Sequence, residues 1–245
     1  MTIAIEYRHV QKNYGEQVII PDFNLSVEKG AFITIIGSSG CGKTTVLKMV
    51  NGLVLPTSGQ VLLEGTDITT LDLINLRRNI GYAIQGSVLF PHMTVEENIA
   101  YVPTLLNGSD KERTLRAVSK WMKIVGLDEA IRKRYPDELS GGQQQRVGIA
   151  RALAASPEIL LMDEPFGAVD ALTRGQLQEE LQRIYLQTGI TVLFVTHDIH
   201  EALKLGTRVL VMDRGQILQY APPAELVQNP ATAFVRQMVG REQVI

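Results

Sequence analysis

Short apolar runs bounded by polar turn residues are the clearest pattern along this chain. Such runs, without alternation, are typical of strands buried on both faces of a parallel sheet. Segments with helical periodicity lie between them, and strands that alternate with helices predict an α/β core. The predicted core strands are Phe32 to Ile36, Ile159 to Met162, Thr191 to Thr196 and Val209 to Met212. One helical face between them is formed by Leu177, Leu181, Ile184 and Tyr185, before a stop at Gly189.

The segment from Gln85 to Ser156 carries helical patterns and no predicted strand. Three residue pairs in it fit capping boxes, in which a Ser or Thr and a Glu or Gln three residues later satisfy the N–H groups of a helix start. We therefore predict a helical lobe inserted in the α/β core. The pairs are Thr94 with Glu97, Ser109 with Glu112 and Ser140 with Gln143, and Leu115, Val118, Met122 and Val125 repeat at helical spacing. From Pro222 onward we expect two short amphipathic segments around Pro230.

Composition and charge exclude several classes of protein. The formal net charge of -2 does not indicate the broad basic surface of a nucleic-acid binder. The single cysteine excludes an intrachain disulfide. Residues 1–10 alternate apolar and polar side chains, which predicts a strand and not a signal peptide. No stretch reaches the ~18 consecutive apolar residues that span a bilayer, so another chain must cross any membrane that this protein serves.

A phosphate-binding loop follows the first predicted core strand and precedes the helical run 45–50. Its glycines let backbone N–H groups surround phosphate oxygens, Lys43 places a positive charge on the outer phosphates, and Thr44 offers a hydroxyl to Mg²⁺. An ordinary glycine-rich turn is the alternative, and the strand-to-helix context disfavours it. We therefore predict an ATP and Mg²⁺ site that includes Gly37, Ser38, Ser39, Gly40, Cys41, Gly42, Lys43, Thr44 and Thr45. Cys41 is expected to be a small filler.

Two predicted core strands end in ionisable side chains. Asp163 and Glu164 close one of them, and His197 closes another. Because doubly wound sheets place ligands at the carboxyl ends of their strands, we expect all three beside the P-loop. Asp163 then holds Mg²⁺, Glu164 orients or deprotonates the attacking water, and His197 contacts the γ-phosphate. A solvated carboxylate pair and a structural histidine are the alternatives.

Two further segments carry features of a nucleotide site. Tyr14 lies in a polar loop before the P-loop, where its ring either stacks on adenine or fills the core. Ser140 to Gln143 opens a helix, whose N–H groups and dipole attract anions. Two glycines there weaken the helix start by about 1 kcal/mol each but permit close approach of a ligand. The chain thus holds one full nucleotide loop and half of another, which suggests ATP held between two copies; the half-site is Ser140, Gly141, Gly142 and Gln143.

In chain order these motifs resemble the ATP-binding cassette ATPases of membrane transporters. The resemblance covers nearly the whole chain and rests on the P-loop, Gln85, the signature Leu139 to Gln143, the pair Asp163 and Glu164, the turn Gly167 to Asp170, and His197. It implies an α/β P-loop NTPase with a RecA-like core, an N-terminal antiparallel β subdomain and an inserted α-helical subdomain. The implied divisions are a core lobe of 1–85 and 157–221, a helical signature lobe of 86–156, and a tail of 222–245.

The same resemblance implies partners and two further roles. Two copies pack head to tail, so that each ATP lies between the P-loop of one copy and Ser140 to Gln143 of the other. Gln85 contacts Mg²⁺ and the attacking water and senses the membrane partner, and Asp170 links the two sites. The other implied partners are transmembrane permease subunits and, indirectly, a solute-binding protein, with no nucleic acid. The chain would lie at the cytoplasmic face of the membrane, held there by the permease.

A narrower likeness is to importers of osmoprotectants such as glycine betaine, choline or carnitine. It rests on Ile80 to Gln85, Leu89 to Ala100, Tyr135 with Pro136, and Asp163 to Gly167. The chain departs from the usual pattern at 86–88 and at Val169. Many such relatives carry paired sensing modules after the ATPase, and the chain stops at Ile245, so we expect no osmotic gating within it.

Three other functions compete with this interpretation. The cargo could be a sulfonate, nitrate or amino acid, because the ATPase never touches the cargo. A soluble ATPase of translation or DNA maintenance would generally carry two cassettes or a long coiled-coil insertion, and neither is found. A non-hydrolysing regulatory subunit is disfavoured because every expected catalytic position is filled.

Overall fold

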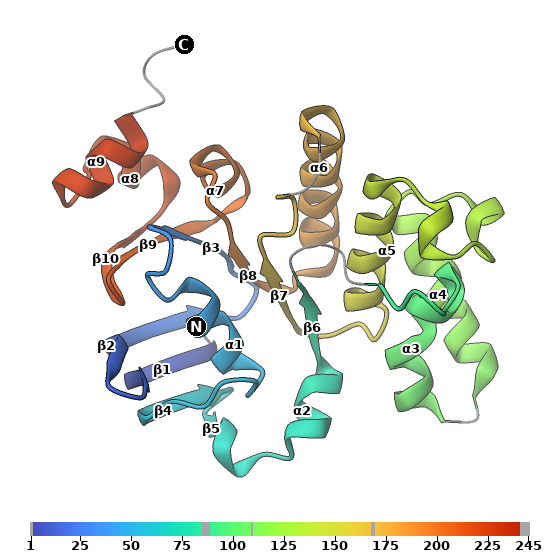
Figure 1. The fold of residues 1–245 in the computed structure, drawn as a ribbon, viewed down its shortest axis with the longest axis horizontal. Helices are drawn as coiled ribbons and strands as arrows, with labels where there is room; N and C mark the ends of the chain where they lie inside the picture. Colours follow the sequence, from blue (N-terminus) through green and yellow to red (C-terminus); the bar gives the residue numbers. More distant parts are fainter. Residues whose placement is uncertain (1, 85–88, 109, 168–169, 241–245) are drawn as a thin grey trace. The chain divides into compact units, whose positions relative to one another are not determined.

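The computed structural model describes residues 2–84, 89–108, 110–167 and 170–240 (Figure 1). The chain divides into two compact units, the first formed by Met1–Leu73 with Ile190–Ile245 and the second by Ile74–Gly189. The lobe boundaries expected from the sequence stay a prediction.

The first unit contains an antiparallel sheet with the strand order β2-β1-β4-β5 (Figure 1). Side chains of β2 alternate between buried and exposed from Phe23 to Val27, and the rings of Tyr7 in β1 and Phe23 in β2 meet edge to face at 5.1 Å between centroids. This sheet confirms the predicted N-terminal β subdomain. The elements are β1 (Ile3–Tyr14), β2 (Gln17–Glu28), β4 (Ser58–Leu63), β5 (Thr66–Asp67) and the 3-10 turn η1 (Ile68–Thr70).

The first unit also contains the strand series β10-β9-β3-β8. Strand β3 is buried along its whole length and pairs in parallel with β8 on one side and β9 on the other, as its unalternated apolar run predicts. Helices α1 and α7 pack against β3. The elements are β3 (Phe32–Gly37), α1 (Lys43–Val50), β8 (Thr191–Val195), α7 (Ile199–Leu205), β9 (Arg208–Asp213) and β10 (Gln216–Ala221).

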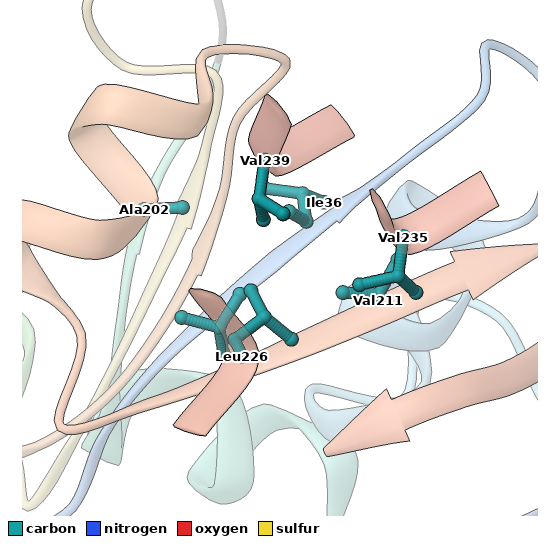
Figure 2. Packing of buried hydrophobic residues seen from close by; sticks show 7 residues of the cluster. Ile36, Ala202, Val211, Leu226, Val235 and Val239 are labelled. Atoms are coloured by element: carbon teal, nitrogen blue, oxygen red, sulfur yellow. The ribbon is translucent and has the colours of Figure 1, made fainter. Parts of the chain in front are cut away.

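Two short helices complete this unit, α8 (Pro223–Gln228) and α9 (Ala233–Val239). Figure 2 shows that Leu226 of α8 and Val235 and Val239 of α9 meet a buried apolar cluster on β3, α7 and β9. The two amphipathic segments expected after Pro222 are therefore part of the core of the first unit, because each buries its apolar face there. The remaining members of the cluster are Ile36, Ala202, Val209 and Val211.

The second unit pairs two parallel strands, β6 and β7, with a set of helices (Figure 1). All five residues of β7 are buried. Helix α3 packs against α4 and α5, and α5 also packs against β6. The elements are α2 (Leu73–Asn79), β6 (Ile80–Ala83), α3 (Val95–Asn107), α4 (Lys111–Ile124), α5 (Gly141–Leu153), β7 (Ile159–Asp163), α6 (Ala171–Thr188) and the 3-10 turns η2 (Glu129–Ile131) and η3 (Pro136–Glu138).

Helix starts and faces in the second unit confirm some sequence expectations and correct two. Thr94 and Ser140 form the predicted capping boxes, and Gly189 ends α6 in the left-handed conformation. Helix α4, however, starts from Asp110, whose side chain accepts from the N–H of Arg113; Ser109 lies outside the described residues.

The second correction concerns the face of α4 that is buried. Leu115 is 44% exposed, although Val118 and Met122 are buried as predicted. Thr114 and Trp121 occupy the buried face instead. The repeat alone could not show this, because at 3.6 residues per turn Leu115 lies on the edge of the apolar stripe.

Candidate functional site

The P-loop joins β3 to α1 in the first unit, as the motif predicts. Lys43, the first residue of α1, is only 8% exposed. Its ammonium donates hydrogen bonds to the carbonyl oxygens of Gly37 and Ser38, both at 2.9 Å. The positive charge is therefore held inside the loop, where a polyanion would meet it. Helix α1 begins without a side-chain cap, so its N-terminus presents backbone N–H groups and the positive end of the helix dipole.

Strand β9 and the turn after it brace the P-loop. Ser38 donates from its hydroxyl to a carboxylate oxygen of Asp213 at 2.6 Å, and the N–H of Gly215 donates to the carbonyl of Cys41 at 3.0 Å. A Cβ at Gly37 would lie 2.0 Å from the carbonyl oxygen of Met212, so only glycine fits there. No sequence motif links Asp213 to the P-loop, because it lies 175 residues from Ser38.

His197 and Tyr14 lie in the same unit as the P-loop. The N–H of Thr196 donates to the carbonyl of Ile35 at 3.1 Å, so the chain enters His197 at the edge of the sheet where the P-loop begins. His197 is exposed. Tyr14 is the last residue of β1 and not part of a polar loop as expected. Its side chain is nevertheless 50% exposed, which leaves its ring accessible to a base.

Asp163 is the last residue of β7 in the second unit, and Glu164 follows it. Asp163 is 8% exposed, and Glu164 has a left-handed backbone with φ 44°, rare for a residue with a side chain. Such strain often accompanies sites in which a side chain must point in one direction. Register pairs Met162 with Ala83, so the chain after β6 leaves at the same edge; Gln85 itself lies outside the described residues.

The donor chemistry of Thr44 and Asp163 suits Mg²⁺, which prefers oxygen ligands. Among the described residues no group of three or more His, Cys, Asp or Glu side chains gathers as a metal cage. A hydroxyl and a carboxylate are the donors that Mg²⁺ uses when phosphate oxygens and water complete its shell. Each residue by itself thus has the donor chemistry of a magnesium ligand, and that both hold one cation stays a prediction.

The signature residues begin α5, capped by Ser140. The Ser140 hydroxyl accepts from the N–H of Gln143, and the Gln143 side chain accepts from the N–H of Ser140. A Cβ at Gly142 would lie 2.7 Å from Cγ2 of Thr173 in α6, whereas one at Gly141 would meet nothing within 4 Å. The close approach inferred from two glycines is thus, at Gly142, an approach of the same chain, whereas Gly141 is exposed.

Helix α5 and the residues after Glu164 are tied together within the second unit. The side-chain amide of Gln145 donates to the carbonyl of Pro165. Asp170 caps α6 by accepting from the N–H of Thr173, the residue that contacts Gly142. The start of α5 is therefore in contact both with Pro165, which follows β7, and with the first turn of α6. No sequence motif pointed to this role of Gln145, because only the structure shows that its side chain is buried against Pro165.

A groove of about 310 Å³ opens elsewhere in the second unit, between α2, β6, α3 and α5. The Arg151 guanidinium lies 5.1 Å from the ring centre of Phe90, and burial lowers the pKa of Arg151. Aromatic and guanidinium groups together suit a partner that is apolar with a negative charge. The lining includes Arg77, Arg78, Tyr82, Ile84, Phe90, Tyr101 and Arg151.

Tyr82, which lines this groove, has a buried hydroxyl with no hydrogen-bond partner in the described part of the chain. Burial, together with the negative charge of Asp163, raises the pKa of the phenol. In contrast, the buried hydroxyl of Tyr7 donates to the carbonyl of Val46 at 2.9 Å.

These two tyrosines make a matched pair for a stability measurement. Tyr82→Phe removes an unsatisfied polar group, so we expect the free energy of unfolding to stay unchanged or to rise by up to about 1 kcal/mol. Tyr7→Phe removes the buried hydrogen bond to the carbonyl of Val46, so we expect a loss of about 0.5–1.5 kcal/mol. Denaturant unfolding of both variants measures the difference. A loss above 1 kcal/mol for Tyr82→Phe would show that its hydroxyl has a partner.

The predicted site residues thus fall into two groups. The first unit holds the P-loop, Tyr14 and His197, and the second holds Asp163, Glu164, the signature loop and Asp170. That the two groups meet around one nucleotide stays a prediction. No helix in the described ranges is long and apolar enough to cross a membrane.

Comparison with known proteins places these motifs in context. The family described as "ABC transporter" matches residues 20–167. The chain is 47% identical to the carnitine transport ATP-binding protein OpuCA of Listeria monocytogenes, covering 98% of this chain and 61% of that protein. It is 49% identical to the glycine betaine uptake system ATP-binding protein YehX of Escherichia coli, covering 98% and 78%. The chain thus spans about three fifths of the length of the first relative.

A polyamine relative and a solved structure extend the comparison. The chain is 43% identical to the spermidine/putrescine import ATP-binding protein PotA of Bacillus cereus, covering 100% of this chain and 74% of that protein. The structure of a dimeric ATP-binding cassette in a post-hydrolysis state, bound to ADP and Pi, matches with a TM-score of 0.80 at 33% identity, covering 89% of this chain and 98% of that chain.

Proposed function

Since this chain belongs to the ABC transporter family, we propose that it is the ATP-hydrolysing subunit of an importer whose membrane-spanning subunits are separate chains. The observation that carries the proposal is the pairing, in one chain, of a complete P-loop with a buried lysine and a second helix start at Ser140. The first is equipped to hold a triphosphate, and the second to contact one from outside.

Each of the site residues would have its own role in ATP hydrolysis. Lys43 and the N–H groups at the start of α1 stabilise the negative charge that develops on the phosphates. Thr44, Asp163 and Gln85 would hold Mg²⁺, which when bound would neutralise part of the charge on the phosphates. Glu164 accepts the proton of the attacking water, and His197 contacts the γ-phosphate.

We further propose that the active form is a head-to-tail dimer. The glycine at 141 is open to a ligand, yet Ser140 and the P-loop stand at the starts of different helices in different units. A second copy would bring its Ser140 to Gln143 onto the nucleotide of the first. ATP binding would close the dimer and hydrolysis would reopen it, which drives alternating access in the membrane subunits. Solved relatives described as dimeric support dimerisation.

The permease contact is proposed to lie at the groove in the second unit. Ile84 lines that groove and directly precedes Gln85, to which the resemblance assigns sensing of the membrane partner. The proposed occupant is a short permease segment that places apolar side chains against Phe90 and Tyr101 and a carboxylate among the arginines. In this arrangement the chain would be peripheral, at the cytoplasmic face of the membrane.

A negative charge introduced at the groove tests this contact. Tyr101, 40% exposed, lines the groove, whereas Tyr135 is 45% exposed and lies outside it. We expect Tyr101→Glu to reduce co-purification with the permease subunits at least tenfold while ATP affinity stays unchanged. Tyr135→Glu is the matched control and should retain the complex. Full retention of the complex by Tyr101→Glu would exclude the groove as the contact.

For the cargo we propose an osmoprotectant of the quaternary-amine type, such as glycine betaine, choline or carnitine. The names of several relatives at 46–49% identity support this class. The polyamine relative at 43% identity favours a second candidate, a spermidine-type cation.

Reconstituted transport decides between these cargoes. The chain is combined in vesicles with the permease and binding protein encoded beside it, and uptake of labelled glycine betaine, choline, carnitine and spermidine is measured with ATP inside. ATP-dependent uptake of a quaternary amine, with phosphate release, is the expected result. Uptake of spermidine alone would identify spermidine as the cargo in place of a quaternary amine. The absence of phosphate release in the complete complex would overturn the ATPase assignment.

A further inference from the structure

Lys12 contacts both the exposed ring of Tyr14 and the segment after the P-loop helix. Its ammonium lies 4.9 Å from the centre of the Tyr14 ring, within the range of a cation–π contact. The same ammonium donates a hydrogen bond to the carbonyl of Leu55 at 2.9 Å. One charged group therefore joins the end of β1 to residues that follow α1.

The segment that Lys12 reaches is itself fastened to α1. The N–H groups of Leu53 and Val54 donate to the carbonyl of Lys48 in the last turn of α1, at 3.1 and 3.2 Å. Leu55 is the next residue, so the acceptor of Lys12 is held by the helix that begins at the P-loop.

Two more hydrogen bonds join the same segment to β1. The N–H of Thr57 donates to the carbonyl of Gln11 at 2.8 Å, and the N–H of Asn13 donates to the hydroxyl of Thr57 at 3.0 Å. The backbone on both sides of Lys12 is thus fixed relative to α1. The remaining freedom is that of the Tyr14 side chain, and the Lys12 ammonium contacts its ring.

We propose that Lys12 is a positioning residue for the nucleotide base. This inference rests on the proposed function, in which the ring of Tyr14 stacks on adenine. With the ammonium over the ring and its hydrogen bond to Leu55, the ring is held ready before the base arrives. A binding site whose side chains are already ordered loses less conformational entropy when the ligand binds. Lys12 does not contact the phosphates in this scheme, so its effect is confined to ligands that carry a base.

The test compares ATP with inorganic tripolyphosphate, which has the phosphates and no base. We expect Lys12→Met, which keeps the length of the side chain and removes the charge, to raise the Kd for ATP about 3- to 10-fold. The Kd for tripolyphosphate should stay within twofold. Lys12→Arg, which keeps a cation, should restore most of the ATP affinity. Lys29→Met is the matched control, because Lys29 pairs with Glu64 and should affect neither ligand.

A double-mutant cycle separates positioning from general stability. Tyr14→Ala should weaken ATP binding by itself, and adding Lys12→Met to it should cause no further loss, because the ring on which Lys12 acts is absent. Equal weakening of ATP and tripolyphosphate by Lys12→Met, or an undiminished effect without the ring, would overturn the proposal. If Tyr14→Ala leaves ATP affinity unchanged, Tyr14 does not stack on adenine, and the positioning role of Lys12 is excluded as well. If Tyr14→Ala weakens binding but Lys12→Met does not, only Lys12 is excluded.

Discussion

Glu164→Gln is expected to lower the rate of ATP hydrolysis by about 10²–10⁴-fold while ATP affinity changes little. The amide has nearly the same shape as the carboxylate, so the strained backbone at φ 44° and the neighbouring Asp163 keep their positions. The amide cannot accept the proton of the attacking water, however, so only the chemical step loses its general base. Phosphate release under saturating Mg-ATP measures the rate, and equilibrium binding of a labelled nucleotide measures the affinity.

A control variant and a second measurement make this prediction specific. Glu179→Gln, an exposed carboxylate of α6, should hydrolyse ATP at the normal rate. Because Glu164→Gln binds ATP without consuming it, light scattering should show that the variant forms dimers when ATP is present. Normal phosphate release from Glu164→Gln would remove this residue from its catalytic role. A variant that stays monomeric with saturating Mg-ATP, even beside the permease, would contradict the sandwiched nucleotide.

Lys43→Ala is expected to weaken ATP binding by about 10- to 150-fold, the range for loss of a charge-assisted hydrogen bond. The ammonium of Lys43 is buried between the carbonyls of Gly37 and Ser38, so the lost charge cannot be replaced by a neighbouring flexible side chain. Calorimetric titration with a non-hydrolysable ATP analogue measures the Kd. Lys48→Ala, on the same helix α1, is the control and should bind ATP normally.

The Lys43 variant also requires a check on folding. Replacing Lys43 takes one donor away from the carbonyls of Gly37 and Ser38, so the free energy of unfolding of the variant should be measured as well as its ATP affinity. Weakened binding in a chain that unfolds at the normal denaturant concentration identifies loss of the phosphate contact. Unchanged ATP affinity would show that Lys43 does not reach the phosphates.

Much of the candidate site was predictable because its chemistry is local in the sequence. Each motif occupies a few consecutive residues: the P-loop, the capped helix start at Ser140, and the acids Asp163 and Glu164 at the end of β7. The periodicity of the neighbouring strands and helices predicts that these motifs lie at the ends of elements. Leu115 and Asp110 show where this fails. An edge position on a helix, or a choice between adjacent capping residues, depends on small energies that packing decides.

By itself, the sequence determined the α/β class, the position of each motif and the family, since these depend on periodicity and on short-range chemistry. Only the tertiary structure decided that the carboxylate of Asp213 accepts a hydrogen bond from Ser38 and that Thr173 lies against Gly142. It also decided that the ammonium of Lys12 lies over the ring of Tyr14 and donates to the carbonyl of Leu55. Apart from the pair Lys12 and Tyr14, which are both in β1, these contacts join residues from separate segments of the chain, in the first case 175 positions apart. Strand pairing and helix packing create them, and no local pattern of side chains records which elements will meet.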